Sequence, residues 1–173
     1  MQAVRREPRE GRVTGTLPFG WDKERRDLFE RAKRKEGAHC GLCLRYIKVY
    51  DRSINSSMAR WLIQLVRRYE IEPRWFGVSE SWSKQINARD ICLFKHWGMT
   101  LMKPKDASDG RKRTSGYWKP TSVGVAFARR ECSVPCYKVL YNNELIFEKG
   151  PQVTIVHAIG KKFDHGELMS KGL

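Results

Sequence analysis

The segment that decides the fold is residues 55–69, Asn55-Ser56-Ser57-Met58-Ala59-Arg60-Trp61-Leu62-Ile63-Gln64-Leu65-Val66-Arg67-Arg68-Tyr69, because it has the clearest helical pattern in the chain. Its large apolar residues recur at helical spacing at Met58, Trp61, Leu62, Leu65, Val66 and Tyr69. The side chains of Asn55, Ser56 and Ser57 can cap a helix at its start. We therefore predict an amphipathic helix over residues 58–69, whose opposite side carries Arg60, Gln64, Arg67 and Arg68.

Weaker patterns surround this helix. A very basic helix is predicted over residues 21–36, closed by Gly37, and a half-buried strand over residues 44–50. A second helix is predicted over residues 88–97, between Asn87 and Gly98, and a third over residues 121–129. Further expected elements are strands at 99–102, 137–140, 144–147 and 153–157 and a short helix at 164–169. Asn142 and Asn143 suit a tight hairpin turn, since Asn tolerates positive φ.

The charge of the chain is its most unusual property. Among 173 residues there are 34 Lys and Arg but 19 Asp and Glu, a formal net charge of +15. Such an excess repels itself in a compact protein, so it indicates a polyanionic partner, and nucleic acid is the common case. By charge alone, a ribosome-associated protein or a binder of an acidic protein surface looks the same.

Targeting signals are not visible. No apolar run approaches the ~20 residues of a membrane span, and the first residues lack the apolar core of a secretory signal. We therefore expect a cytoplasmic protein associated with nucleic acid. In a reducing cytosol, the five cysteines are expected as thiols or metal ligands rather than disulfides.

Four cysteines form two close pairs, Cys40 with Cys43 and Cys132 with Cys136. A tetrahedral Zn²⁺ commonly takes two thiolates from each of two tight turns, so this spacing predicts a structural zinc site. The second pair has one extra residue and contains Pro135, and His39 or His157 can replace one sulfur. The alternative is that these residues are small hydrophobic thiols with chance spacing. Cys92 lies among apolar residues of a predicted helix and is expected in the core.

The order of helices, basic loop and hairpin resembles a winged helix-turn-helix. The resemblance is to small winged-helix regulators of phage and archaeal type, and it rests on residues 88–98 (ARDICLFKHWG), residues 116–121 (GYWKPT), Gly124 and Phe127. It spans about residues 55–150. It implies a helix in the major groove and a β-hairpin wing, here residues 137–147, on the backbone.

We accordingly predict an α+β fold, with a winged-helix-like body, a β-hairpin and a small zinc-knuckle element. The expected organisation is a basic arm and short helix at 1–36, a zinc-stapled winged-helix-like domain at 37–150, and a strand and short helix at 151–173. The size of the chain and its basic arm also fit a phage-encoded accessory protein.

Candidate nucleic-acid contacts follow from charge and position. Arg111, Lys112 and Arg113 lie in a glycine-containing loop with no visible core role, which favours phosphate contact. The arm has Arg5, Arg6, Arg9 and Arg12, and Lys84, Gln85, Asn87 and Arg89 are side chains of the kinds that contact base edges. The predicted contact set is Arg60, Arg67, Arg68, Lys84, Arg89, Lys103, Lys105, Arg111, Lys112 and Arg113. Trp75, Phe76 and Trp82 can stack on unpaired bases or be buried.

Catalytic motifs are not apparent in the sequence. There is no glycine-rich phosphate loop, HExxH, GxSxG or zinc-deaminase signature, so no catalytic residue is assigned. We therefore expect a non-enzymatic nucleic-acid-binding protein, with DNA preferred to RNA because of the winged-helix resemblance. Two alternatives stay open: a protein–protein module such as an inhibitor of a nucleic-acid enzyme, and a metal-dependent nuclease using Asp106 and Asp109.

Overall fold

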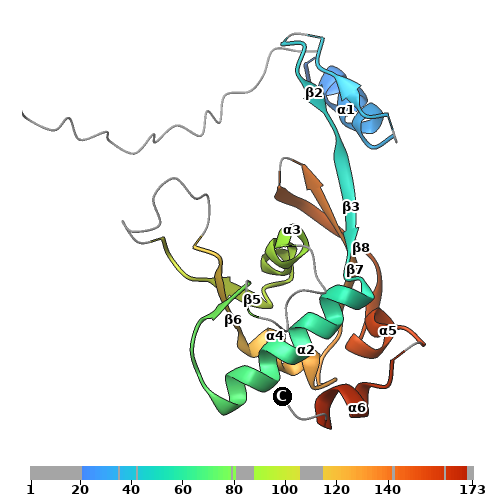
Figure 1. Cartoon of the computed structure of the whole chain (residues 1–173). Coiled ribbons are helices and arrows are strands. Elements are labelled where there is room, and N and C mark those ends of the chain that lie inside the picture. The colour runs from blue at the N-terminus through green and yellow to red at the C-terminus, as the bar shows by residue number, and fades with distance from the viewer. Residues whose placement is uncertain are drawn as a thin grey trace, which may run out of the picture. The chain divides into compact units, whose positions relative to one another are not determined.

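The computed structural model describes residues 21–34, 36–41, 43–78, 80, 88–105, 115–141, 143–161 and 163–170. The chain divides into two compact units, Met1–Lys48 and Val49–Leu173. Helices and small antiparallel sheets occur in both (Figure 1). The protein is therefore of the mixed α+β class.

In the first unit, a helix accompanies a short hairpin. The helix is α1 (Trp21–Ala32), and β1 (Ala38–His39) pairs with β2 (Tyr46–Ile47). The helix ends before the predicted residue 36, although Gly37 has the expected left-handed φ of 73°. The Tyr46 hydroxyl donates a hydrogen bond to the Glu36 carbonyl oxygen over 2.7 Å, which ties the hairpin to the segment after the helix.

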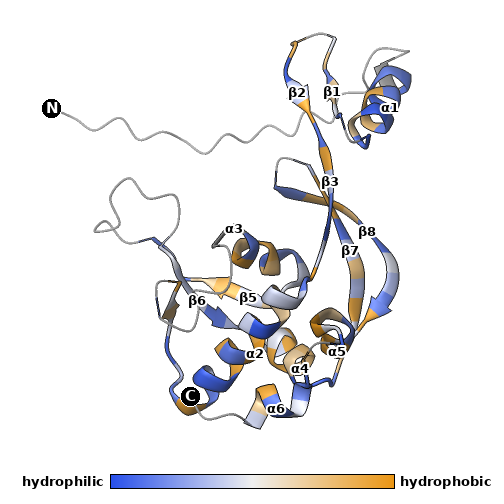
Figure 2. Cartoon of the chain, turned by 45° about the vertical axis from the view of Figure 1, so that its right-hand side comes forward, coloured by the Kyte–Doolittle hydropathy of each residue, from blue (hydrophilic) through white to orange (hydrophobic). Residues whose placement is uncertain are grey.

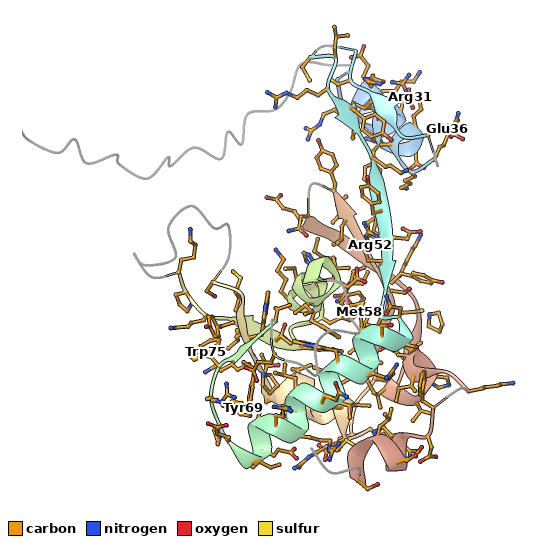
Figure 3. All side chains as sticks on the ribbon, in the orientation of Figure 1. Arg31, Glu36, Arg52, Met58, Tyr69 and Trp75 are labelled. Carbon is orange, nitrogen blue, oxygen red and sulfur yellow. The ribbon has the colours of Figure 1, made fainter. Side chains whose placement is uncertain are left out.

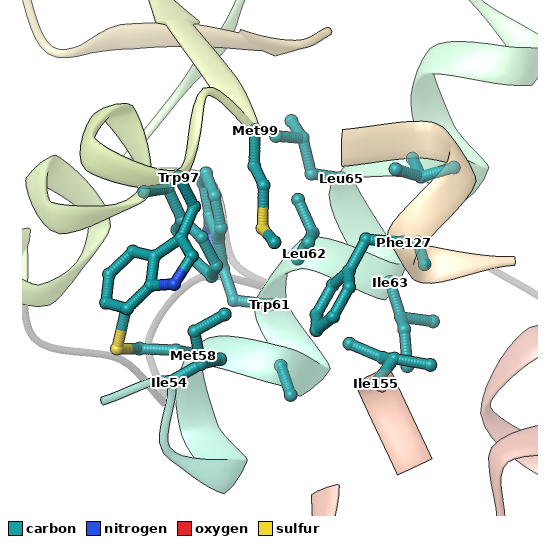
Figure 4. Close-up of a cluster of buried hydrophobic side chains, with 14 of the residues drawn as sticks. Ile54, Met58, Trp61, Leu62, Ile63, Leu65, Trp97, Met99, Phe127 and Ile155 are labelled. Atoms are coloured by element: carbon teal, nitrogen blue, oxygen red, sulfur yellow. The ribbon is translucent and has the colours of Figure 1, made fainter. Parts of the chain in front are cut away.

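The second unit is built around α2 (Ser56–Ile71), which extends the predicted helix at both ends. The Asn55 side chain caps it by accepting a hydrogen bond from the Met58 amide over 2.9 Å. Its apolar face is buried together with Trp97, Met99, Phe127 and Ile155 from later parts of the chain (Figure 4). Burying a large apolar side chain contributes about 1.5–3 kcal/mol, so this face is the main source of cohesion in the unit.

Two three-stranded antiparallel sheets flank this core. One has the order β3-β7-β8, from β3 (Val49–Ser53), β7 (Val134–Tyr141) and β8 (Glu144–Val153). The other has the order β4-β6-β5, from β4 (Phe76–Gly77), β6 (Tyr117–Pro120) and β5 (Thr100–Met102). The predicted hairpin is confirmed as β7–β8, and Asn143 in its turn has a φ of 63°.

The remaining helices are short. They are α3 (Ala88–Ile91), continued by the 3-10 helix η2 (Cys92–Trp97), then α4 (Ser122–Ala128), α5 (Ile155–Ile159) and α6 (His165–Ser170). These match the predicted helices near 88–97, 121–129 and 164–169. Helices α4, α5 and α6 all contact α2.

The predicted strand at 153–157 is wrong, because β8 ends at Val153 and α5 begins at Ile155. The side chains of Thr154 and His157 form a capping box that starts the helix. Ile155 and Ile159, one helical turn apart, are both buried in the core. A short apolar run fits a strand or a buried helix equally well, and here the cap and the packing select the helix.

Helix α4 packs so closely against the residue before β5 that only glycine fits at one position. Thr121 caps α4, its hydroxyl accepting from the Gly124 amide over 3.1 Å and donating to the Gly98 carbonyl oxygen over 2.6 Å. The Thr121 amide also donates to the Met99 carbonyl oxygen over 3.0 Å. A Cβ on Gly124 would overlap that same Met99 oxygen. The contact therefore fixes α4 against the start of β5.

We predict that Gly124→Ala lowers the free energy of unfolding by about 1–3 kcal/mol, the usual cost of overpacking. Val123→Ala on the exposed side of the same helix is the matched control and should change stability by less than about 1 kcal/mol. Urea unfolding followed by circular dichroism measures both. Equal stability of the Gly124→Ala variant and the wild type would contradict the close packing of α4 on Met99.

Candidate nucleic-acid interface

The predicted arginines of α2 contact other parts of the same unit. The Arg60 guanidinium lies 4.3 Å from the centre of the Phe163 ring. Arg67 donates from Nη1 to the Leu168 carbonyl oxygen over 2.9 Å. Arg68 pairs with Glu80 at 3.8 Å. These contacts show that at least part of the basic side of α2 contributes to the packing of the unit.

Several other predicted contacts lie outside the described residues. This holds for Lys84, Arg111, Lys112 and Arg113, for the side chain of Arg89, and for the basic arm with Arg5, Arg6, Arg9 and Arg12. It also holds for Trp82, Gln85 and Asn87. Their assignments stay predictions from the sequence.

Lys103 and Lys105 follow β5, at the start of the connection to β6. The Lys103 amide donates to the Tyr117 carbonyl oxygen over 2.9 Å, which extends the pairing of the two strands. The Ser115 hydroxyl donates to the Lys103 carbonyl oxygen over 2.7 Å. Both ends of the connection are therefore held to the sheet. In the sequence, residues 103–115 contain five Lys or Arg and two Asp.

Strand pairing places one set of aromatic and basic residues on the side of sheet β4-β6-β5 away from the core. Phe76 pairs with Trp118 and both are buried, so alternation sends Tyr117 and Lys119 to the opposite side. Leu101, which pairs with Lys119, lies on that side and is 50% exposed. We call Trp75, Leu101, Lys103, Tyr117 and Lys119 the outer face of this sheet. In Figure 2, hydrophobic β5 lies beside β6, which has hydrophilic segments.

Two lysines of the outer face lie over its aromatic rings. The Lys119 ammonium is 4.8 Å from the centre of the ring of Trp75, the residue labelled in Figure 3. The Lys103 ammonium is 5.9 Å from the centre of the Tyr117 ring. Both distances lie within the ~6 Å range of cation–π attraction. The outer face therefore combines positive charge with aromatic surface.

Sequence reasoning found part of this face. It flagged Trp75 as a possible stacking residue and Lys103 as a phosphate contact, but missed Tyr117, Lys119 and Leu101. The structure reveals these positions through the alternation of exposed and buried residues in β6 around Trp118, which the sequence alone does not show. Phe76, also flagged for stacking, is 2% exposed and belongs to the core.

The first cysteine pair lies in the turn between β1 and β2. The Cys40 amide donates to the Arg45 carbonyl oxygen over 3.0 Å, and the Leu44 amide donates to the Cys40 carbonyl oxygen over 2.9 Å. Leu44 has a φ of 58°, a left-handed conformation that reverses the chain. Cys40 and Cys43 therefore lie on one tight turn, as a zinc knuckle requires.

The second cysteine pair lies in the other unit, Cys132 before β7 and Cys136 within it. Burial raises the pKa of the Cys132 thiol, and the charge of Glu131 raises it further. In the described part of the chain, no group of three or more His, Cys, Asp or Glu side chains is arranged to hold a metal ion. A site using all four cysteines needs sulfur atoms from both units and stays a prediction.

Two titratable groups lie on or beside the 3-10 helix η2. Burial raises the pKa of the Cys92 thiol, in agreement with its packing against the core. Burial also lowers the pKa of His96, a shift that its hydrogen bond to Asn143 opposes and the charges of Lys95 and Lys138 reinforce. This direction favours the neutral form of His96.

We predict that Arg67→Met destabilises the protein without weakening electrostatic binding. Losing the charged hydrogen bond to the Leu168 carbonyl oxygen should cost about 1–2 kcal/mol of unfolding free energy. The slope of log affinity against log salt, measured on duplex DNA, should stay unchanged, because this guanidinium is engaged within the fold. A slope shallower by about one, with unchanged stability, would show instead that Arg67 contacts a phosphate.

Two further findings bear on function. In the described part of the structure, no helix is long and apolar enough to cross a membrane. No protein-family model, curated protein or solved structure matches this chain.

Proposed function

We propose that this protein binds nucleic acid, with DNA preferred to RNA, through phosphate contacts on a winged-helix-like body, and that it acts as a regulatory or accessory protein rather than an enzyme. The supporting observation is the basic connection between β5 and β6 on a sheet of order β4-β6-β5. A polyanionic partner also accounts for the net charge of +15.

Topology supports the winged-helix comparison. Strand β4 follows α2, the α3–η2 helix precedes β5, and β6 returns between β4 and β5. In this arrangement the β5–β6 connection, residues 103–116, takes the position of a wing. The predicted wing at 137–147 belongs to the other sheet, with β3. The proposal therefore assigns backbone contact to the β5–β6 connection.

The α3–η2 helix takes the position of the groove-binding helix in this comparison. Phe94 and Trp97 are buried and fix one side of it against the core, while Lys95 is exposed. Arg89 belongs to the same helix by sequence. A helix anchored by its apolar side can present its other side to a groove.

We predict that the double variant Lys103→Gln, Lys105→Gln loses part of the salt dependence of binding. Each lysine on a phosphate contributes about one to the slope of log affinity against log salt, so the slope should become shallower by about one to two. Fluorescence anisotropy with labelled duplex DNA across a salt series measures it.

The matched control removes two charges elsewhere, in Arg130→Gln, Lys161→Gln, both exposed and outside the β4-β6-β5 sheet. It should leave the slope nearly unchanged. Equal changes of the slope in both variants would mean that the salt dependence reflects only the overall charge of the protein. Negligible binding of wild type to duplex DNA, single-stranded DNA and RNA would reject the proposed function and favour a protein partner.

Zinc is part of the proposal as a structural cofactor held by Cys40, Cys43, Cys132 and Cys136. The tight turn that holds the first pair supports it. We predict about one zinc per chain in metal analysis of purified protein, since one ion takes four ligands. Cys43→Ser should lose the metal and part of the thermal stability, whereas Cys92→Ala, outside both pairs, should keep the metal. A metal-free wild type with a cooperative thermal transition would reject the zinc site.

A further inference from the structure

We propose that the outer face of sheet β4-β6-β5 binds unpaired bases of single-stranded nucleic acid, which stack on Tyr117 and Trp75 while Lys103 and Lys119 contact the flanking phosphates. This inference rests on the proposed function and names the form of nucleic acid that this face recognises.

Residues that lie opposite one another on neighbouring strands form two rows across the outer face. One row has Leu101 paired with Lys119, whose ammonium lies over the Trp75 ring. The other has Gly77 paired with Tyr117, whose carbonyl oxygen accepts a hydrogen bond from the Lys103 amide. Gly77 adds no side chain to its row. Tyr117 is 46% exposed and Leu101 is 50% exposed. The face therefore offers flat apolar surface of the kind that a base covers when it stacks.

The charged groups on and beside the outer face favour a polyanion over an apolar protein surface as its ligand. Strands β4, β5 and β6 contain no acidic residue. The nearby Glu80 accepts from the Gly77 amide over 2.9 Å and pairs with Arg74 at 3.2 Å, so its carboxylate is neutralised at the edge of the face. The outer face thus has two ammonium groups beside its rings and a neutralised carboxylate at its margin.

A base can stack on these rings only if the lysine side chains move away from them. The Lys119 and Lys103 ammonium groups lie over the rings that a base would cover. A base that stacks on the ring takes the place of the ammonium, and the flexible lysine side chain moves to a neighbouring phosphate. Each cation–π contact is then exchanged for a base–aromatic contact and an ion pair.

Whether the outer face suits single-stranded or duplex nucleic acid depends on which surfaces of the bases are accessible. In a duplex the faces of the bases are covered by neighbouring base pairs, so a planar ring on a sheet cannot reach them. An unpaired strand offers the face of every base, and binding by stacking tolerates any sequence. The outer face therefore suits a single strand, while the α3–η2 helix and the β5–β6 connection suit a duplex.

The test is anisotropy with the full-length protein and three labelled probes: an oligothymidylate, an oligouridylate and a duplex of mixed sequence. Tyr117→Leu should weaken binding of the single strands by roughly five- to a hundred-fold, the range for loss of one stacked base. It should leave duplex binding within about two-fold, a change too small to reflect a lost stacking contact. Tyr117→Phe keeps the ring and should bind like wild type.

Tyr141→Leu is the matched control, because Tyr141 is an exposed tyrosine on a strand of the other sheet. It should leave single-strand binding unchanged. Trp75→Phe supplies a second readout: wild type should lose more tryptophan fluorescence on adding oligothymidylate than this variant does. Urea midpoints within error of wild type show that each variant is folded.

The outcomes separate the two proposals. If Tyr117→Leu binds single strands like wild type while the Lys103, Lys105 variant still loses salt dependence on duplex DNA, the stacking face is rejected and the proposed function stands. If wild type binds none of the three probes in a salt-dependent way, both are rejected. Preference for oligouridylate over oligothymidylate, with the same loss in Tyr117→Leu, would support the face and identify RNA as its ligand.

Discussion

Burial of the apolar face of α2 is the constraint on which the larger unit depends. Leu62, Ile63 and Leu65 are fully buried, and elements from four later parts of the chain pack against this helix. None of α4, α5 and α6 has more than seven residues, a length that is marginal for an isolated helix in water. Their stability therefore comes from packing on α2, and the position of β5 and β6 follows from the same contacts.

Packing on α2 also limits where the positive charge can act. One side of the helix forms the core, and Arg60 and Arg67 on its polar side hold residues near the C-terminus. An arginine with a long apolar stem can stabilise a helix contact as well as bind a phosphate. The net charge alone therefore does not show which residues would contact a partner. The position of the basic connection between β5 and β6 is the more specific guide.

Much of the secondary structure could be predicted, and the failures have physical causes. Residues 58–69 were predictable because six large apolar residues keep helical spacing over three turns, whereas residues 153–157 are too few to distinguish a strand from a helix. Strands of two residues, such as β4, show no alternation to detect. The cysteine spacing identified a tight turn around Cys40 and Cys43, yet spacing alone carries no information on which distant groups approach it.

The outer face could be located only with the register of the sheet in hand. Core packing requires Phe76 and Trp118 to point inward, and alternation then directs Tyr117 and Lys119 outward whatever their identities. The core therefore places no demand on the outward positions of β6. In most sheets with one solvated face such positions are polar, since exposed aromatic surface gains nothing from folding. Lys119 fits this rule, whereas Tyr117, beside Trp75 and Leu101, leaves aromatic surface exposed, and the proposed nucleic-acid ligand would cover it.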